Sequence, residues 1–242
     1  MRRFFAPSEN INDGQVTLDE SETRHLRDVL RLRAGETVNV FDGVGNEYES
    51  RIDQIGKRET TLSIVQRIQP PAAESDLDLT ICASILKGDK TDFAVPKLVE
   101  LGVNRFVPML SARCDVKPKD AAKRVERWRK IAFEASKQCG RARLMSIEEI
   151  TDFKTCLSRE AEKADRDLIL FSERDGTPFY ITKTPASVTA FLGPEGGWDD
   201  VEIEAAANVG SDVITLQGRI MKADTAAIAI SAILQHRFGD LS

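Results

Sequence analysis

A strand-like run that ends in a glycine-rich turn occupies residues 187–197, which read SVTAFLGPEGG. The apolar residues 187–192 predict a buried strand, and Gly193, Gly196 and Gly197 follow it closely. Glycines let the backbone approach a ligand and adopt positive φ. The spacing fits neither the G-x-G-x-x-G dinucleotide fingerprint nor a P-loop. Three glycines exceed what a tight turn needs, so we interpret this segment as a ligand loop, with a plain strand-to-helix turn as the alternative.

Predicted strands and helices alternate along the chain on both sides of this loop. Apolar runs predict strands at 77–86, 105–110, 167–171, 187–192 and 212–216. Helical spacing predicts helices at 92–101, 120–138, 201–207 and 223–238. This order predicts an α/β domain with a parallel sheet that is covered on both faces. Ligands of such sheets bind outside the carboxyl ends of the strands, which is where the glycine-rich loop lies.

The residues that precede this region have a different pattern. Alternating apolar residues predict strands at 36–41, 48–55 and 61–68, and helical spacing predicts a short helix at 21–32. Between the two regions, residues 69–75 read QPPAAES, a polar stretch with two prolines that is typical of a linker. We therefore expect two domains, a small β-rich one at 1–70 and the α/β one at 75–242.

A second loop, LQGRIMKADT at 216–225, follows the predicted strand 212–216 and opens the last helix. Asp224 and Thr225 could cap that helix. Arg219 and Lys222 are harder to explain as caps, because the helix macrodipole disfavours cations near an N-terminus. Their presence indicates an anionic partner, or an oxyanion that needs stabilisation.

The last predicted helix is apolar on nearly every side in its first half, where residues 226–233 read AAIAISAI. A helix of this kind packs deep in a core or against another subunit.

Composition limits the classes of function. The chain has 242 residues, with 41% hydrophobic and 30% charged residues, which is typical of an ordinary globular protein. No apolar run is long enough to span a bilayer, and the basic N-terminus lacks the apolar segment of a signal peptide, so we expect a cytoplasmic protein. The four cysteines form no C-x-x-C pair and there are two histidines, which argues against a zinc site and against hydrolases that need a histidine base.

The net charge of −5 argues at first against a nucleic-acid partner, but the charge is unevenly distributed. Residues 87–145 contain 15 Lys/Arg and 7 Asp/Glu, whereas residues 146–242 contain 9 and 17. The basic segment is either a footprint for phosphates or a solvated helix face with charge pairs along it, and the charges alone do not separate the two.

Taken together, the two loops resemble the C-terminal motif pair of the knotted SPOUT methyltransferases, and more closely the family that methylates uridine N3 in 16S ribosomal RNA. The motifs are LGPEGG at 192–197 and RIMKADTA at 219–226. Other landmarks of the family occur in the same order along the whole chain. They are HLRDVLR at 25–31, FDG at 41–43, KGDK at 87–90, ELGV at 100–103, ASKQCGR at 135–141 and RFG at 237–239.

The resemblance implies an N-terminal PUA-like β-barrel that binds RNA and a C-terminal SPOUT α/β domain with a trefoil knot and a parallel sheet. It further implies S-adenosyl-L-methionine as the cofactor, 16S ribosomal RNA or the small ribosomal subunit as the partner, a homodimer, and no metal or membrane. The residues expected to hold the cofactor are Leu192, Gly193, Gly196, Gly197, Leu216, Gly218, Ile220 and Met221. The candidates for RNA phosphate contacts, with a solvated surface charge as the alternative for each, are Arg3, Arg27, Arg31, Lys137, Arg141 and Arg143.

In this interpretation four residues carry the chemistry. Uridine N3 must lose its proton, which places negative charge on O2 and O4 of the ring. We expect Arg219 to stabilise that charge with support from Lys222, and Glu195 or Asp224 to accept the proton. Two other functions remain open, namely SPOUT methylation of a ribose 2′-hydroxyl and a non-catalytic RNA-binding role in ribosome assembly.

The chain departs from the family pattern in the second loop. Gln217 and Gly218 stand where the family usually has Gly-Pro, and Lys222 and Asp224 stand where it usually has Arg and Glu. Lysine keeps the charge but lacks the planar fork of arginine, and aspartate is one methylene shorter than glutamate. These changes affect the fine geometry of the cofactor loop.

Overall fold

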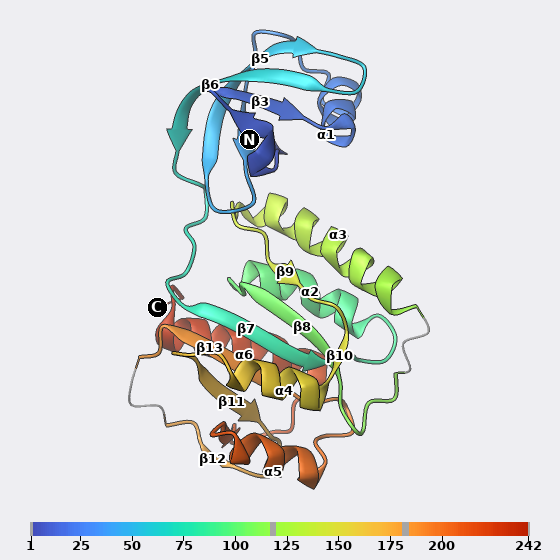
Figure 1. The fold of residues 1–242 in the computed structure, drawn as a ribbon, viewed down its shortest axis with the longest axis vertical. Coiled ribbons are helices and arrows are strands. Elements are labelled where there is room, and N and C mark those ends of the chain that lie inside the picture. The colour runs from blue at the N-terminus through green and yellow to red at the C-terminus, as the bar shows by residue number, and fades with distance from the viewer. Residues whose placement is uncertain (1, 117–119, 181–183, 242) are drawn as a thin grey trace. The chain divides into compact units, whose positions relative to one another are not determined.

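The computed structural model describes residues 2–116, 120–180 and 184–241. The chain divides into two compact units, each with its own sheet. The first unit comprises Met1–Glu74 and Ser136–Leu144, and the second comprises Ser75–Ala135 and Met145–Ser242. Figure 1 shows the course of the chain through both units.

The first unit is built on a curled, six-stranded sheet in the order β1-β4-β5-β6-β3-β2. Its strands are β1 Arg3–Phe5, β2 Ile11–Asn12, β3 Gln15–Leu18, β4 Thr37–Phe41, β5 Glu47–Ile55 and β6 Thr60–Ile68. β1 pairs with β4 in parallel, and every other pair is antiparallel. Since the edge strands β1 and β2 do not pair with each other in the described part of the chain, the sheet forms a half-barrel. The expected strands at 36–41, 48–55 and 61–68 are confirmed as β4, β5 and β6.

One helical segment covers the core of this unit. The expected helix at 21–32 consists of α1 Glu20–Arg24 and a π-helical turn, η2 His25–Val29. The Asp19 carboxylate caps α1 by accepting the Glu22 amide N–H. A short turn, η1, spans Ser8–Asn10. The buried core of the unit comprises Phe4, Ala6, Val16, Leu18, Leu26, Leu32, Val38, Val40, Ile52 and Leu62.

Buried ion pairs hold the returning segment Ser136–Leu144 in the first unit. Arg3 forms a salt bridge with Glu47, whose side chain is inaccessible to solvent, and donates to the carbonyl oxygens of Ser136 and Arg141. Arg141 is itself paired with Glu74 at 2.7 Å. The linker predicted at 69–75 ends the first part of this unit, but no feature of the sequence predicted that residues 136–144 return to it.

The second unit contains an eight-stranded sheet in which every pair is parallel. The strand order is β10-β8-β7-β13-β11-β14-β12, with β9 paired to β8. The predicted parallel sheet is therefore confirmed, and 105–110, 167–171 and 187–192 are strands with these bounds. The strands are β7 Asp78–Ser84, β8 Arg105–Leu110, β9 Ser146–Ile147, β10 Thr151–Asp152, β11 Asp167–Phe171, β12 Thr177–Pro178, β13 Ser187–Leu192 and β14 Asp212–Thr215.

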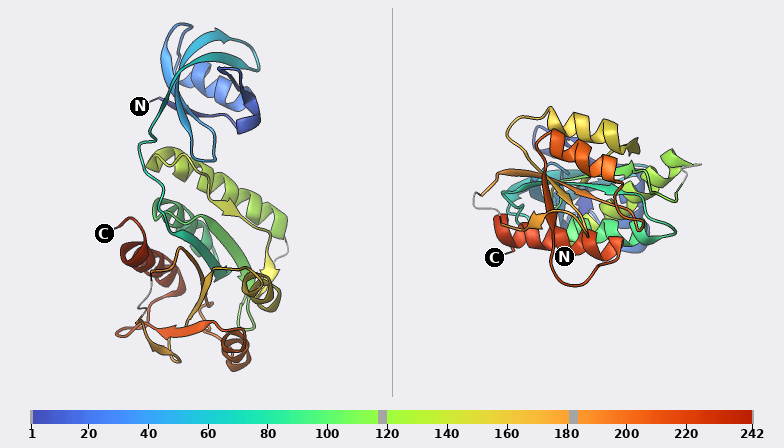
Figure 2. Two further views of the ribbon diagram at one scale, coloured as in Figure 1. Left: turned by 60° about the vertical axis from the view of Figure 1, so that its left-hand side comes forward. Right: turned by 90° about the horizontal axis from the view of Figure 1, so that it is seen from below.

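Helices cover both faces of this sheet, as predicted. α2 and α6 lie against one face, and α4 and α5 against the other (Figures 1 and 2). The helices are α2 Lys90–Glu100, α3 Ala121–Cys139, α4 Phe153–Ala161, α5 Asp200–Asn208 and α6 Ala223–Phe238. Beneath α4 and α5, Phe153 packs against Phe191 and Trp198 with ring centroids 6.1 and 5.0 Å away. The same buried cluster includes Leu168 and Leu170 of β11, so β11 and β13 both pack into this core.

Two expectations concern the chain as a whole. The trefoil knot stays a prediction, because strand order does not define whether one segment passes through a loop of another. Within the described ranges, no helix is long and apolar enough to cross a membrane.

Candidate active site

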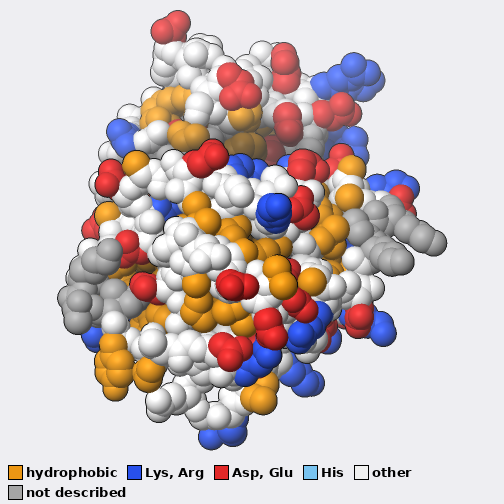
Figure 3. All heavy atoms as spheres, turned by 60° about the horizontal axis from the view of Figure 1, so that its bottom comes forward, with side chains coloured by type: hydrophobic (Ala, Val, Ile, Leu, Met, Phe, Trp, Pro, Cys, Tyr) orange, Lys and Arg blue, Asp and Glu red, His pale blue; other side chains and the backbone are white. Residues whose placement is uncertain are grey.

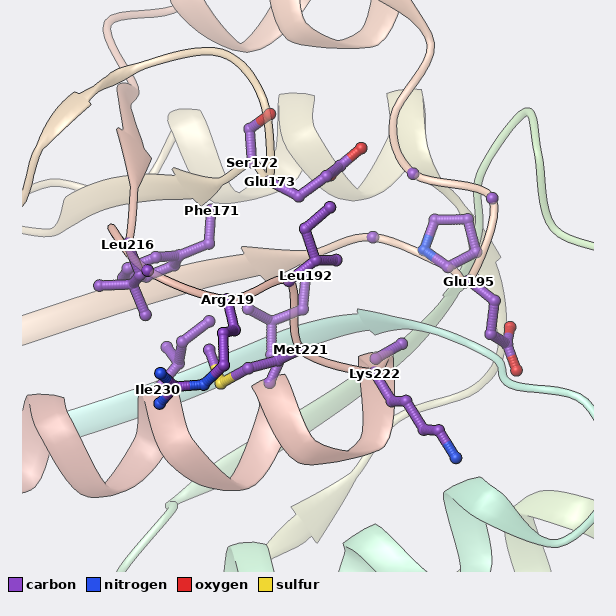
Figure 4. Close-up of a pocket in the computed structure, with 18 residues that line it drawn as sticks. Phe171, Ser172, Glu173, Leu192, Glu195, Leu216, Arg219, Met221, Lys222 and Ile230 are labelled. Atoms are coloured by element: carbon purple, nitrogen blue, oxygen red, sulfur yellow. The ribbon is translucent and has the colours of Figure 1, made fainter.

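A cavity of about 500 Å³ lies at the carboxyl ends of β11, β13 and β14, beside the first turns of α6. Figure 4 shows its lining, which comes from three strand-end loops and the helix. The cavity brings together all eight residues expected to hold a cofactor, and also Glu195, Arg219 and Lys222. Asp224, the fourth expected catalytic residue, lies in the first turn of α6 and is not part of the lining.

The glycines of the loop after β13 are required by close packing. A Cβ at Gly193 would lie 3.1 Å from the indole ring of Trp198, and one at Gly196 would lie 3.1 Å from the Cβ of Arg113. Gly197 has a φ of +69°, and its missing Cβ would collide with the carboxylate of Glu173. The loop thus has little room for side chains, because Trp198, Arg113 and Glu173 occupy the space beside its glycines.

The far end of this loop is anchored in the core. The Trp198 indole donates a hydrogen bond of 2.8 Å to the carbonyl oxygen of Phe171, at the end of β11. The next residue, Asp199, caps α5, and the Glu202 carboxylate accepts a hydrogen bond from the Asp199 amide N–H, which completes a capping box. Two neighbouring strand ends are therefore held together at the cavity.

Glu195 is engaged with the loop that follows β7. Its Oε1 lies 2.7 Å from Nζ of Lys90 and 3.3 Å from the amide nitrogen of Lys87. Burial raises the pKa of the Glu195 carboxyl, but the hydrogen bonds from Lys90 and from backbone amides outweigh it, so that pKa lies below its usual value. Figure 4 shows the carboxylate directed away from Arg219. At neutral pH Glu195 is thus a paired carboxylate.

The two cations of the second loop are free of such partners. The side chains of Arg219 and Lys222 form no hydrogen bond or ion pair with another residue in the described ranges, and both residues are exposed. Lys222 occupies the N-cap position of α6, and no side chain caps the helix there. The expectation that Asp224 and Thr225 cap α6 is wrong, since both lie within its first turn, where the Asp224 carboxylate accepts the Thr225 amide N–H at 3.0 Å.

The six residues expected to contact RNA divide into two groups. Three form ion pairs within the first unit: Arg3 pairs with Glu47, Lys137 with Glu22, and Arg141 with Glu74. The other three have more accessible side chains. Arg27 pairs with Asp28 and reaches the carbonyl oxygens of Gly56 and Lys57, while Arg31, with a φ of +54°, and Arg143 are exposed.

Sequence reasoning missed one wall of the cavity. Phe171, Ser172 and Glu173 line it from the end of β11, and Pro194, Ala223, Ala226 and Ile230 complete the lining. The rule that ligands bind at strand ends, applied to residues 167–171, would have pointed to Glu173 two positions further on.

The cavity suits an organic cofactor with charged groups. Its volume lies within the usual range for small-molecule sites of roughly 300–1,000 Å³. Apolar side chains surround two acidic and two basic residues. Among the described residues no group of three or more histidine, cysteine, aspartate or glutamate side chains could hold a metal ion.

Comparison with known families gives two matches. Residues 73–235 match the model of an RNA methyltransferase domain, and residues 18–65 match that of an RNA methyltransferase PUA domain.

Similar proteins cover nearly the full chain. A solved structure of ribosomal RNA small subunit methyltransferase E from Neisseria gonorrhoeae, bound to S-adenosyl methionine, is 33% identical and covers 100% of both chains with a TM-score of 0.89. A putative methyltransferase from Legionella pneumophila, in complex with the same cofactor, is 27% identical with a TM-score of 0.84 and covers 99% of this chain and 98% of its own. Ribosomal RNA small subunit methyltransferase E from Buchnera aphidicola is 29% identical over 94% of this chain and 92% of the relative.

Proposed function

Given that this chain belongs to the RNA methyltransferase domain family, we propose that it transfers a methyl group from S-adenosylmethionine to N3 of a uridine in 16S ribosomal RNA. One observation carries the proposal. Three strand-end loops gather a glycine-lined cavity and two unpaired cations at one place, and similar proteins with this fold were solved with S-adenosylmethionine bound.

The residues of the cavity fit this cofactor. Gly193, Gly196 and Gly197 line the cavity with backbone, and Leu192 and Met221 offer apolar surface. We assign cofactor contacts to these residues and to Leu216, Gly218 and Ile220. The cofactor supplies a methyl group already activated by its sulfonium.

The cations of the second loop stabilise the acceptor. Loss of the N3 proton leaves negative charge on O2 and O4 of the uracil ring, and a guanidinium can donate to acceptors in one plane. Arg219 has no described partner that would compete for it, so it takes this role, with Lys222 in support.

A carboxylate accepts the N3 proton. The Glu195 carboxylate is paired with Lys90, and this bond holds its pKa below the usual value, so it is less available to take up a proton. Asp224 has no salt bridge among the described residues and stands in the turn that follows Lys222. We therefore rank Asp224 first and Glu195 second as the general base.

The first unit, matched over residues 18–65 by the PUA model, takes part in RNA binding in this proposal. Arg27, Arg31 and Arg143 remain the candidates for phosphate contacts, because the charges of Arg3, Lys137 and Arg141 are already paired within the unit. Since N3 lies on the Watson–Crick edge, the target uridine must be unpaired or flipped out of its helix.

We further propose that the protein works as a homodimer in the cytoplasm. Ile220 beside the cavity is 81% exposed, and Ile228 and Ile233 of α6 are only half-buried. A second copy of the chain would cover this apolar surface and complete the site.

The test is methylation of 16S ribosomal RNA from a strain that lacks this protein, followed by mass spectrometry of the nucleosides. We expect 3-methyluridine, together with a stop of reverse transcriptase at the modified base that requires both enzyme and cofactor. A ribose 2′-O-methyl product would instead indicate the other chemistry. Absence of cofactor binding in calorimetry would indicate a non-catalytic RNA-binding protein.

A further inference from the structure

Of the charged side chains that line the cavity, some form ion pairs with other described residues and some do not. The lining contains four charged side chains, namely Glu173, Glu195, Arg219 and Lys222. Glu195 is paired with Lys90, whereas Glu173 forms no hydrogen bond or ion pair with any other residue that the structure describes. The cavity therefore presents one free carboxylate and two free cations to its ligand.

Glu173 lies on the wall of the cavity at the end of β11. It follows β11, whose last residue, Phe171, accepts the indole hydrogen bond of Trp198. Its carboxylate lies directly over Gly197, so close that any side chain there would collide with it. In Figure 4, Glu173 extends toward the glycine-rich loop on one side of the cavity, and Arg219 lies on the other.

The Arg174 guanidinium attracts Glu173 electrostatically but forms no ion pair with it. Arg174 is the adjacent arginine, but its guanidinium is committed to Asp175 at 3.2 Å, to the carbonyl oxygen of Trp198 at 2.9 Å, and to Asp200. A free carboxylate on the wall of a ligand cavity attracts a cationic group of the ligand. S-adenosylmethionine carries two such groups, the sulfonium and the α-ammonium.

We propose that Glu173 binds a positive charge of S-adenosylmethionine and so helps the enzyme to select the charged cofactor. This inference rests on the proposed function, because it takes S-adenosylmethionine as the ligand. It assigns the free acidic residue to the cofactor and leaves Arg219 and Lys222, on the opposite side, to the uracil ring.

Calorimetry with three ligands tests the proposal. S-adenosylmethionine has both positive groups, S-adenosylhomocysteine keeps only the ammonium, and methylthioadenosine has neither while retaining the ribose and adenine. For Glu173→Gln we expect the dissociation constant of S-adenosylmethionine to rise about tenfold or more, as expected for loss of a charge-assisted bond. Methylthioadenosine should bind the variant and the wild type equally.

The intermediate ligand identifies the cation. If S-adenosylhomocysteine loses as much affinity as S-adenosylmethionine, Glu173 contacts the ammonium; if its affinity is unchanged, Glu173 contacts the sulfonium. Equal losses for all three ligands would show a ribose contact and overturn the proposal. Unchanged binding of all three, with or without a loss of kcat, would also overturn it.

Two controls keep the interpretation clear. Glu204→Gln removes an equivalent exposed carboxylate from α5 and should leave all three dissociation constants unchanged. Glu173→Asp retains the charge and should recover part of the affinity. If the wild type itself does not bind S-adenosylmethionine, the proposed function fails, whereas equal binding by wild type and Glu173→Gln contradicts only the role of Glu173.

Discussion

Nζ of Lys90 lies 2.7 Å from Oε1 of Glu195, and this ion pair joins the loop after β7 to the glycine-rich loop after β13. The two side chains are 39% and 32% exposed, so solvent screens much of their attraction. The pair is therefore suited to hold the loop in place, and it leaves Glu195 little freedom to act as a base.

The first prediction tests this positional role. Lys90→Met and Glu195→Gln should each weaken cofactor binding about threefold, as expected for a partly screened pair. The double variant should be no weaker than either single one, because both changes remove the same interaction. Calorimetry measures the effect, and Lys97→Met, which breaks the Glu100 pair elsewhere on α2, serves as the control. Additive losses would show that the two residues act separately.

The second prediction separates chemistry from binding at Arg219. Arg219→Ala should lower kcat by about 10² or more, the loss expected when an oxyanion donor is removed. The cofactor dissociation constant and Tm should change little, since the guanidinium binds no other described residue. Arg219→Lys should recover part of the rate. Arg237→Ala, at the far end of α6, is the matched control. A loss of cofactor affinity as large as the loss of rate would indicate that Arg219 only braces the loop.

The third prediction identifies the proton acceptor. In Asp224→Asn, kcat at pH 7 should fall by about 10² or more and should then rise about tenfold per pH unit, because hydroxide replaces the missing base. Glu195→Gln should keep the pH profile of the wild type, since the carboxylate it replaces has a lowered pKa and remains paired at neutral pH. Single-turnover rates between pH 6 and 9 provide the measurement. The opposite assignment follows if the profile changes in Glu195→Gln and not in Asp224→Asn.

The fourth prediction concerns assembly. Ile220 is 81% exposed, so Ile220→Asp should be nearly neutral in a monomer. In the proposed dimer the substitution would bury a charge, and sedimentation at micromolar protein should show a shift toward the monomer together with a loss of activity. Val201→Asp replaces a residue that is 70% exposed on α5 and should leave assembly unchanged. A wild type that is monomeric and fully active would rule out the shared site.

The fifth prediction concerns a buried charge cluster at the opposite ends of the strands. Glu160 is inaccessible to solvent and accepts hydrogen bonds from Arg105 and Lys163. Burial raises its pKa, but these bonds outweigh burial and lower it from 4.5 to about 2. The charged form therefore stabilises the fold fully above pH 4.5, and this contribution is lost as the pH falls toward 2.

Glu160→Gln should accordingly reduce the free energy of unfolding at pH 7 by about 3 kcal/mol, because Arg105 loses a buried partner. The difference from the wild type should shrink as the pH falls below 4.5. Urea unfolding at pH 7, 5 and 3 measures this, with Glu162→Gln, an exposed residue at the end of α4, as the control. A difference that stays constant with pH would contradict the lowered pKa.

Long periodic elements of this fold could be predicted from the sequence, whereas elements made by tertiary contacts could not. β13 and α6 were predicted with their observed bounds, because a buried apolar run and a long apolar helix leave few alternatives. β1 has three residues and exists because β4 pairs with it. α4 was missed although Phe153, Cys156 and Leu157 have helical spacing, since the buried charge of Glu160 interrupts the apolar stripe.

The residues of the site likewise divide into those that local sequence predicts and those that only tertiary contacts bring together. The glycines and cations of two loops are close in sequence and were found together, and the cavity contains them. Glu173 belongs to a third loop, and only the order of strands in the sheet brings it to Gly197. Arg3 and Arg141 were expected to contact RNA because they are basic. Charge alone does not reveal that Arg3 pairs with Glu47 and that Arg141 pairs with Glu74 in the folded protein.

The return of Ser136–Leu144 to the first unit has a consequence for biosynthesis. The Leu144 amide bonds the carbonyl oxygen of Gly43 at 2.9 Å, and Gly45 bonds that of Ala142 at 3.2 Å, so these nine residues complete the structure begun by the first 74. A ribosome adds about 5–20 residues each second, so the 61 residues between Glu74 and Ser136 take several seconds to emerge. During that interval the nascent N-terminal sheet lacks its final segment. The unit at the start of the chain therefore finishes folding only after the first part of the second unit, Ser75–Ala135, has been translated.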